Sequence, residues 1–259
     1  MRRVLVVVCA LLLPSCGGGS GGDDVRDGCP QGDEATLTVL AASSLGPALE
    51  GIGAEFAAAT GCELDIRVSL GSSTALAGQI LGGAPADVFV AAGETAVRTV
   101  TEGLGSAGEP RVVASNTAAL MTRDPGIAAL ADLPAAAGRG AAVGLCVPSA
   151  PCGVLADEVI RKAMPGSSRA GIAATEVPSA ADLRAKIVMG EIDAGIVFAS
   201  DCAGTAVPVR CVSIPAALNS TVTYTAVPLA TDGPAGRFVG FLASPAGASI
   251  LAKNGFTAP

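Results

Sequence analysis

The feature that most constrains the fold is a regular alternation of short apolar segments with segments of helical periodicity along residues 36–259. Residues 37–41 form a short apolar run, and over 45–59 the large apolar residues are spaced by four, three and four positions. That spacing predicts one buried face of a helix, and Gly61 follows it as a helix stop signal. Strands that alternate with helices are typical of α/β architecture with parallel strands.

The alternation continues to the end of the chain. Further strands are predicted over 64–70, 87–91, 118–122, 142–147, 194–198 and 222–229, and further helices over 74–81, 94–102, 154–164, 180–189 and 234–252. The roughly 220 residues that carry this pattern suit one large domain or two lobes.

The first sixteen residues indicate export. Arg2 and Arg3 precede an apolar run over 4–13, a pattern typical of a secretory signal peptide. The run of about ten residues is well below the ~20 needed to span a bilayer. The ending Leu-Pro-Ser-Cys over 13–16 resembles a bacterial lipoprotein box, which implies acylation of Cys16. The alternative is an ordinary cleaved signal with a spare cysteine.

We therefore expect a signal peptide over 1–15 and a lipid-anchored, Gly/Ser-rich flexible tether over 16–35, which together place the protein on the outer face of the cell membrane. The mature chain has 14 basic and 23 acidic residues, a net charge of −9. Nucleic-acid binders are usually basic, so that class is excluded. No second long apolar segment follows, which limits the expected membrane contact to the lipid anchor.

Cysteine usage agrees with an exported protein. Besides one cysteine in the signal and the anchor, six remain, an even number that predicts disulfides. Fifteen pairings are possible, and proximity favours Cys146–Cys152 and Cys202–Cys211, which leaves Cys29–Cys62. A zinc site is the rival interpretation, but the chain has no histidine and no Cys-x-x-Cys pair.

Four predicted strand-to-helix junctions share small residues where a helix begins. They lie at 43–44, 71–73, 151–153 and 178–180. Helix starts offer unpaired N–H groups and the positive end of the helix dipole, and small or hydroxyl residues let an anion approach them. Serines at such places are also good N-caps, which is the alternative for each junction alone. Together, converging junctions would form an anion cage without a charged side chain.

Several segments resemble the periplasmic molybdate-binding protein family. They are residues 41–45, 71–80, 83–89, 151–153, 190–198 and 254–256, and the resemblance covers roughly 37–259. It implies a two-lobed, type II-like periplasmic-binding-protein fold of the α/β class, with a mixed sheet and flanking helices in each lobe and the ligand between them. We expect crossovers near 114–117 and 221–225. Lobe 1 then comprises 36–115 plus 225–259, and lobe 2 comprises 116–224.

The resemblance also implies the site, because in that family two serines, several backbone amides and a tyrosine hydroxyl bind the oxyanion. Carried over by motif, the ligand-binding residues are Ser44 and Ser73, with Ser72 and Ser43 as near alternatives, the amides of Cys152 and Ala180, and Phe198 at the tyrosine position. Phe198 lacks a hydroxyl. Tyr224, the only tyrosine, is the candidate to supply the missing hydroxyl, but nothing in the sequence places it near the site.

The implied function is capture of molybdate, and of tungstate as well, for an ABC permease and its ATPase. We expect a monomer without a cofactor, and molybdenum bound only as the oxyanion, with no direct protein ligand. Sulfate or an organic acid on the same scaffold is the alternative. Organic acids favour an arginine fork, which none of the four junctions contains, and ferric sites usually need tyrosine, histidine or carboxylate ligands.

Catalysis is the third class. A Ser-His-Asp triad is impossible without histidine. None of the three lysines of the mature chain, Lys162, Lys186 and Lys253, lies in a Ser-x-x-Lys motif. We therefore do not expect an enzyme.

Overall fold

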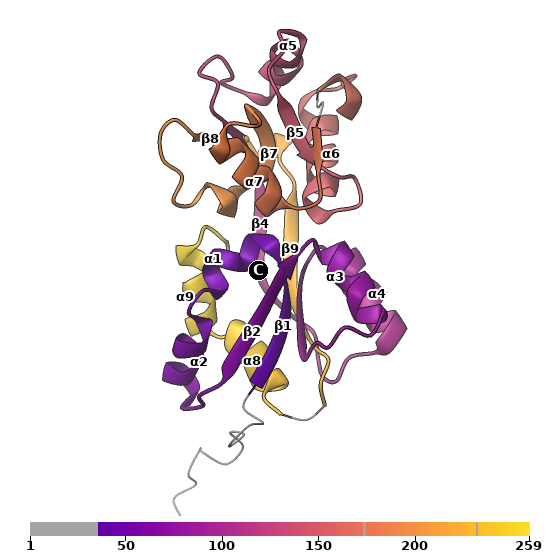
Figure 1. Ribbon diagram of the computed structural model, residues 1–259, viewed down its shortest axis with the longest axis vertical. Coiled ribbons are helices and arrows are strands. Elements are labelled where there is room, and N and C mark those ends of the chain that lie inside the picture. The colour runs from indigo at the N-terminus through magenta and orange to yellow at the C-terminus, as the bar shows by residue number, and fades with distance from the viewer. Residues whose placement is uncertain (1–35, 173–174, 232) are drawn as a thin grey trace, which may run out of the picture.

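The computed structural model describes residues 36–172, 175–231 and 233–259. Its two halves are stacked along the long axis of the molecule and are joined by the strands β4 (Arg111–Thr122) and β9 (Thr221–Pro228) (Figure 1). The predicted signal peptide, the anchor Cys16, the tether and the Cys29–Cys62 pairing all involve residues outside this part of the chain. Within it, no single helix is long and apolar enough to cross a membrane, and only two consecutive helices bent by 62° pass that test together.

The first half contains a mixed sheet in the order β2-β1-β3-β9-β4. Its first three strands are parallel, and β9 runs antiparallel to both β3 and β4. These three strands are β1 (Thr36–Ala42), β2 (Asp65–Gly71) and β3 (Val88–Ala92). Because β1 and β3 are buried on both faces, they consist almost entirely of apolar residues.

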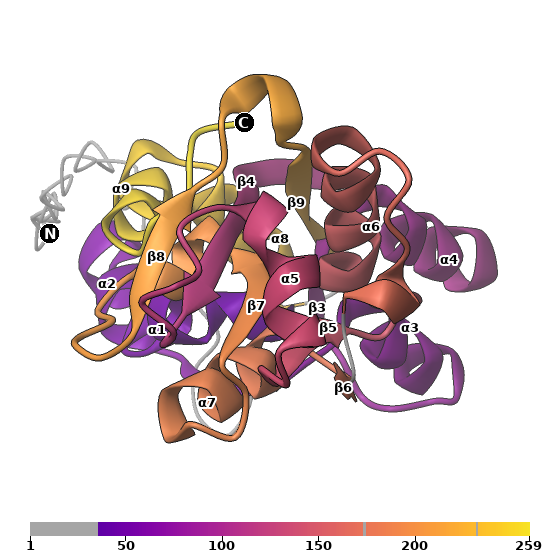
Figure 2. The same ribbon diagram turned by 90° about the horizontal axis from the view of Figure 1, so that it is seen from above.

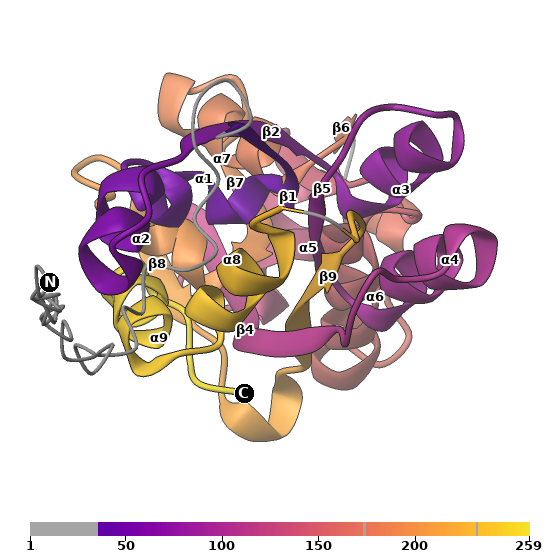
Figure 3. The same ribbon diagram turned by 90° about the horizontal axis from the view of Figure 1, so that it is seen from below.

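Helices cover both faces of this sheet (Figure 3). On one face, a core cluster gathers around the rings of Phe56, Phe238 and Phe241. The helices of that face are α2 (Ile52–Thr60), α8 (Ala235–Leu242) and α9 (Pro245–Lys253), and those of the other are α3 (Ser73–Leu81) and α4 (Glu94–Leu104).

The second half contains the rest of the sheet and one contiguous core. The C-terminal part of β4 pairs antiparallel with β7 and β8, while β7, β5 and β6 are parallel neighbours. The strands are β5 (Val143–Cys146), β6 (Thr175–Val177), β7 (Ala194–Phe198) and β8 (Arg210–Ser213), and the helices are α5 (Leu133–Gly138), α6 (Pro151–Ala163) and α7 (Ala180–Met189). Figure 2 shows these helices around the central strands.

The structure confirms the α/β class and corrects several details. The helix predicted over 45–59 is divided into the 3-10 turn η2 (Ser43–Leu45), α1 (Gly46–Leu49) and α2. Gly51 separates α1 from α2 with a φ of +73°, a left-handed conformation that ends a helix and that glycine adopts without steric cost. The apolar spacing therefore predicted the buried face but not the break.

The expected mixed sheet is confirmed, because β4 and β9 add antiparallel pairs at the centre of otherwise parallel strands. Strand β4 begins seven residues before the predicted 118–122, and β6 and β8 were not predicted. The polar run Ser115-Asn116-Thr117 lies inside β4, where it is paired with β9 and largely buried. The crossovers expected near 114–117 and 221–225 thus lie within two long strands rather than in loops.

Two of the three predicted disulfides lie in the described residues and are confirmed. Cys146 and Cys152 have sulfurs 2.09 Å apart, and Cys202 and Cys211 have sulfurs 2.02 Å apart. The first bond joins the end of β5 to the first turn of α6. It therefore fixes one of the four predicted junctions.

Candidate functional site

The starts of η2, α3, α6 and α7 converge on one small cavity of about 200 Å³. All seven residues assigned to ligand binding by motif lie among those that line it. The lining residues are Ala42, Ser43, Ser44, Gly71, Ser72, Ser73, Ala92, Pro151, Cys152, Ser179, Ala180 and Phe198. Four segments that lie between residues 43 and 180 of the sequence therefore meet at one place.

The cavity is small and uncharged. Of its empty space, the centre of a water molecule can occupy about 10 Å³, which is close to the minimum that holds one water. The cavity therefore suits a small, compact group. None of the residues that line it carries a charged side chain. Whatever binds there is recognised by hydroxyls, backbone groups and shape.

Two buried serine hydroxyls stand at the cavity wall. Ser73 Oγ accepts a hydrogen bond from the Ala92 N–H at 2.9 Å, which leaves its own hydrogen to be donated. Ser44 Oγ lies 2.8 Å from the Tyr224 hydroxyl. Within the described chain, neither side chain caps the helix that it begins. Capping is instead done by Ser179, which accepts from the Asp182 N–H.

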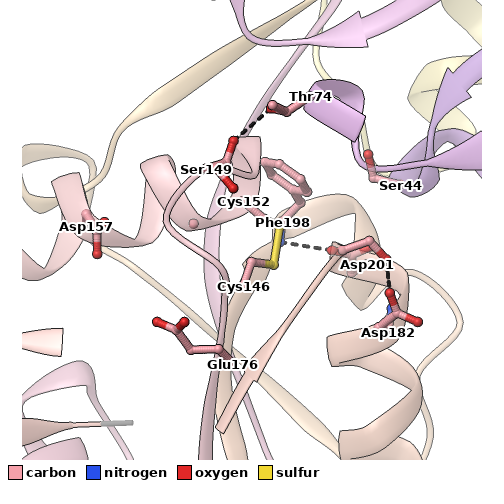
Figure 4. The surroundings of a disulfide bond; sticks show 12 residues. Ser44, Thr74, Cys146, Ser149, Cys152, Asp157, Glu176, Asp182, Phe198 and Asp201 are labelled. Atoms are coloured by element: carbon pink, nitrogen blue, oxygen red, sulfur yellow. Dashed lines mark hydrogen bonds between the residues drawn. A yellow bond between two sulfur atoms is a disulfide. The ribbon is translucent and has the colours of Figure 1, made fainter. Parts of the chain in front are cut away.

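Backbone donors come from α6 and α7. Cys152 is the second residue of α6 and Ala180 the first of α7, and N–H groups at those positions have no acceptor within their own helix. Their side chains are not needed for this, and the Cys152 sulfur is bonded to Cys146 below Phe198 (Figure 4). The motif over 151–153 is thus the first turn of α6 rather than a turn before it, since Pro151 is well suited to the first helical position.

Phe198 supplies an apolar wall to the cavity. The residue is 2% exposed, and its ring packs edge-on against that of Tyr224 with centroids 6.1 Å apart. Tyr224 itself is fully buried and is not among the lining residues. The structure therefore places the single tyrosine next to the site, in contact with the lining residue Phe198 but not itself lining the cavity. The sequence did not predict this position.

The cavity lies between the two halves of the molecule, which are in direct contact around it. The Thr74 hydroxyl, at the start of α3, donates to the Ser149 carbonyl at 2.7 Å, as Figure 4 shows. This bond connects the first half to the segment between β5 and α6. The two halves are therefore in direct contact beside the cavity.

A buried carboxyl group lies next to the site. Asp201 accepts the Phe198 N–H at 3.0 Å. Burial raises the pKa of Asp201 to about 7, against the opposing effects of that N–H and of the nearby Arg184. The folded protein therefore retains a proton on Asp201 over a pH range in which the unfolded chain, with an ordinary aspartate, has lost it.

We predict that the free energy of unfolding falls as the pH rises from about 4 to 7 and then levels off. The folded state binds the Asp201 proton more tightly than the unfolded state, so each pH unit in this window costs up to about 1.4 kcal/mol. Denaturant titrations at several pH values measure the slope. Asp201→Asn keeps an acceptor for the Phe198 N–H and is expected to abolish most of the pH dependence of the unfolding free energy. An unchanged slope in that variant would show that Asp201 does not cause the pH dependence.

A larger cleft, of about 1260 Å³, opens on the side of α4 and α6. Its lining includes the carboxylates of Glu94 and Glu158 together with the exposed side chain of Val154. Two carboxylates disfavour an anion. The small donor-lined cavity is therefore the candidate oxyanion site, although it is not the largest hollow.

Comparisons with known proteins agree with this geometry. The family model for bacterial extracellular solute-binding proteins matches residues 37–257. The molybdate-binding protein ModA of Mycobacterium bovis is 32% identical over 233 residues, covering 86% of this chain and 85% of that protein.

Two solved structures share the fold. The periplasmic molybdate-binding protein of Azotobacter vinelandii superposes with a TM-score of 0.73 at 23% identity, covering 86% of this chain and 99% of that one. The sulfate-binding protein SubI of Mycobacterium tuberculosis gives 0.72 at 17% identity, covering 86% and 87%. The chain thus belongs to the bacterial extracellular solute-binding proteins, in the same family as the ModA molybdate-binding proteins.

Proposed function

We propose that this chain captures molybdate outside the cytoplasm and delivers it to an ABC permease. The observation that carries the proposal is the small cavity between the halves, lined by hydroxyls and helix-start amides without a charged side chain. The 32% identity to ModA supports the choice of ligand. Tungstate, with the same charge and tetrahedral shape, is expected to bind as well.

In the proposed complex the oxyanion receives hydrogen bonds from both halves of the molecule. The hydroxyls of Ser44 and Ser73 donate from the first half, and the N–H groups of Cys152 and Ala180 donate from the second. Ser72 and Ser43 line the same cavity and add further donors. Charge-assisted hydrogen bonds of this kind are about twice as strong as neutral ones.

The donors also provide selectivity. Molybdate, tungstate and sulfate carry no proton near neutral pH, and a site made of donors matches them. Hydrogen phosphate has an O–H that needs an acceptor, and an unpaired buried polar group costs about 1–3 kcal/mol. Discrimination between molybdate and the smaller sulfate then depends on the size of the cavity.

The same proposal assigns the lobes. Lobe 1 comprises 36–115 plus 225–259 and lobe 2 comprises 116–224, with the hinge in the middle of β4 and β9. Opening of the cavity requires the hydrogen bond between Thr74 and Ser149 to break, a hinge motion of the kind that releases ligand in other two-lobed binders. Lipidated Cys16 would keep the monomeric protein beside its permease.

Calorimetric titration of residues 23–259 with molybdate, tungstate, sulfate and phosphate tests the function. We expect tight binding of molybdate and tungstate, weak binding of sulfate and no heat with phosphate. Tight binding of sulfate alone would reassign the ligand on the same scaffold. The absence of heat with all four anions would refute the oxyanion proposal and favour an organic anion.

A further inference from the structure

We propose that Tyr224 is a positioning residue for the oxyanion site, because its hydroxyl donates to Ser44 and so directs the Ser44 hydrogen into the cavity. The inference rests on the proposed function and adds a residue that lies behind the cavity wall. It is carried by the hydrogen bond between Tyr224 and Ser44 and by the complete burial of the tyrosine.

Asn116 is 1% exposed and lies on β4 two residues after Ala114, the residue that pairs with Tyr224 of β9. Its Oδ1 accepts the backbone N–H groups of Thr117 at 2.9 Å and Ser200 at 3.3 Å. Backbone N–H groups can only donate, so the oxygen of this amide faces them and the nitrogen faces the other way. Nδ2 donates to Ser200 Oγ at 2.8 Å, so both ends of the amide are paired with Thr117 and Ser200.

The Tyr224 hydroxyl has only one hydrogen. Tyr224 is fully buried, and its hydroxyl lies 2.8 Å from Ser44 Oγ, the hydrogen-bond partner that the described residues provide. Because a buried hydroxyl hydrogen needs an acceptor and the Ser44 hydrogen can instead enter the cavity, the Tyr224 hydrogen goes to Ser44. Ser44 is then an acceptor toward Tyr224. Its hydrogen is left for a group in the cavity, which Ser44 lines.

The tyrosine ring is held in one place by two other rings. Phe198 packs edge-on at 6.1 Å and Phe256 edge-on at 5.1 Å between centroids. Next to Phe256, Gly255 packs against Ser200, where a Cβ would lie 3.0 Å from the Ser200 Cα, and its φ of +84° also favours glycine. Phe256 of the terminal segment therefore helps to position the ring of Tyr224.

Two consequences follow for binding. Ser44 is fixed as a donor before the ligand arrives, so no hydroxyl has to reorient, and consecutive hydrogen bonds in a buried chain strengthen one another. Because Ser44 then acts only as a donor toward the cavity, its oxygen does not accept the O–H of a protonated oxyanion such as hydrogen phosphate. Tyr224 thus acts on the ligand through Ser44, although the position at the wall is occupied by Phe198, which has no hydroxyl.

A double-mutant cycle with Tyr224→Phe and Ser44→Ala tests the inference. Tyr224→Phe keeps the ring and removes one hydroxyl, and we expect molybdate affinity to fall about 5- to 20-fold, the range of one buried hydrogen bond. In the Ser44→Ala background the same change is expected to alter affinity less than twofold, because the group through which it acts is gone. Calorimetry gives all four affinities, and circular dichroism checks folding.

A selectivity measurement separates positioning from mere support of the fold. With the Tyr224 hydroxyl removed, Ser44 is free to accept, so the ratio of hydrogen phosphate to molybdate affinity is expected to rise at least threefold. Equal effects of Tyr224→Phe on affinity in both backgrounds, or an unchanged ratio of the two affinities, would overturn this inference. Neither result would contradict the proposal that the protein binds molybdate. If the unmodified protein binds no oxyanion, the proposed function and this inference fail together, which the first titration reveals.

Discussion

Replacing both Ser44 and Ser73 with alanine is expected to weaken molybdate binding by two to four orders of magnitude. Each hydroxyl donates to a charged ligand, and such a hydrogen bond contributes about 1.5–3 kcal/mol, with a factor of ten in affinity for every 1.4 kcal/mol. Both serines line the cavity and are at most 5% exposed. Competition of the double variant against the unmodified protein for molybdate, followed by calorimetry, measures the loss.

The matched control is Ser69→Ala. Ser69 lies on β2 with its side chain exposed and away from the cavity, so the same chemical change there is expected to leave affinity unchanged. The Ser73 substitution also removes the acceptor of the Ala92 N–H, which makes the melting temperature a necessary second measurement. A double variant that folds normally and binds within threefold of the unmodified protein would contradict the assignment of both serines.

Gly153→Ala is expected to damage the site through the backbone. A Cβ on Gly153 would lie 2.0 Å from the Val147 carbonyl oxygen and 3.0 Å from that of Cys146, both of which are main-chain atoms at the end of β5. The start of α6 would have to move away from β5 and take the Cys152 N–H with it. We expect a loss of about 1–3 kcal/mol of stability and at least a tenfold loss of molybdate affinity.

Gly78→Ala provides the comparison within another helix. Gly78 lies on the exposed side of α3, and a Cβ there has no neighbour within 4 Å. Alanine is expected to stabilise the protein by about 0.5–1 kcal/mol and leave binding unchanged. Thermal unfolding and calorimetry on both variants separate the two effects, and a Gly153→Ala protein of normal stability and affinity would show that α6 does not depend on this close approach.

Much of the site was predictable because its signals are local. Small residues at the start of α3, α6 and α7 belong to short motifs, and the apolar periodicity next to them identifies the helices. The limits of α7 and β7 agree with prediction to the residue. The pairings of Cys146 with Cys152 and of Cys202 with Cys211 followed from sequence separations of six and nine residues.

The rest depends on contacts between distant parts of the chain. Ser44 and Tyr224 are 180 positions apart, and Asn116 and Ser200 are 84 apart. No local pattern marks such pairs. Asn116 belongs to a polar run that resembles a turn in the sequence. In the structure this run lies inside β4, where it pairs with β9 and the Asn116 amide donates to Ser200.

The most direct test of the account is a crystal structure of the protein grown with molybdate, with diffraction data collected at the molybdenum absorption edge. We predict one strong anomalous peak in the cavity between the starts of α3, α6 and α7. Its oxygens should lie within hydrogen-bonding distance of Ser44 Oγ, Ser73 Oγ and the amides of Cys152 and Ala180. A peak elsewhere, or none in crystals soaked to saturation, would contradict the proposal that these donors form the binding site.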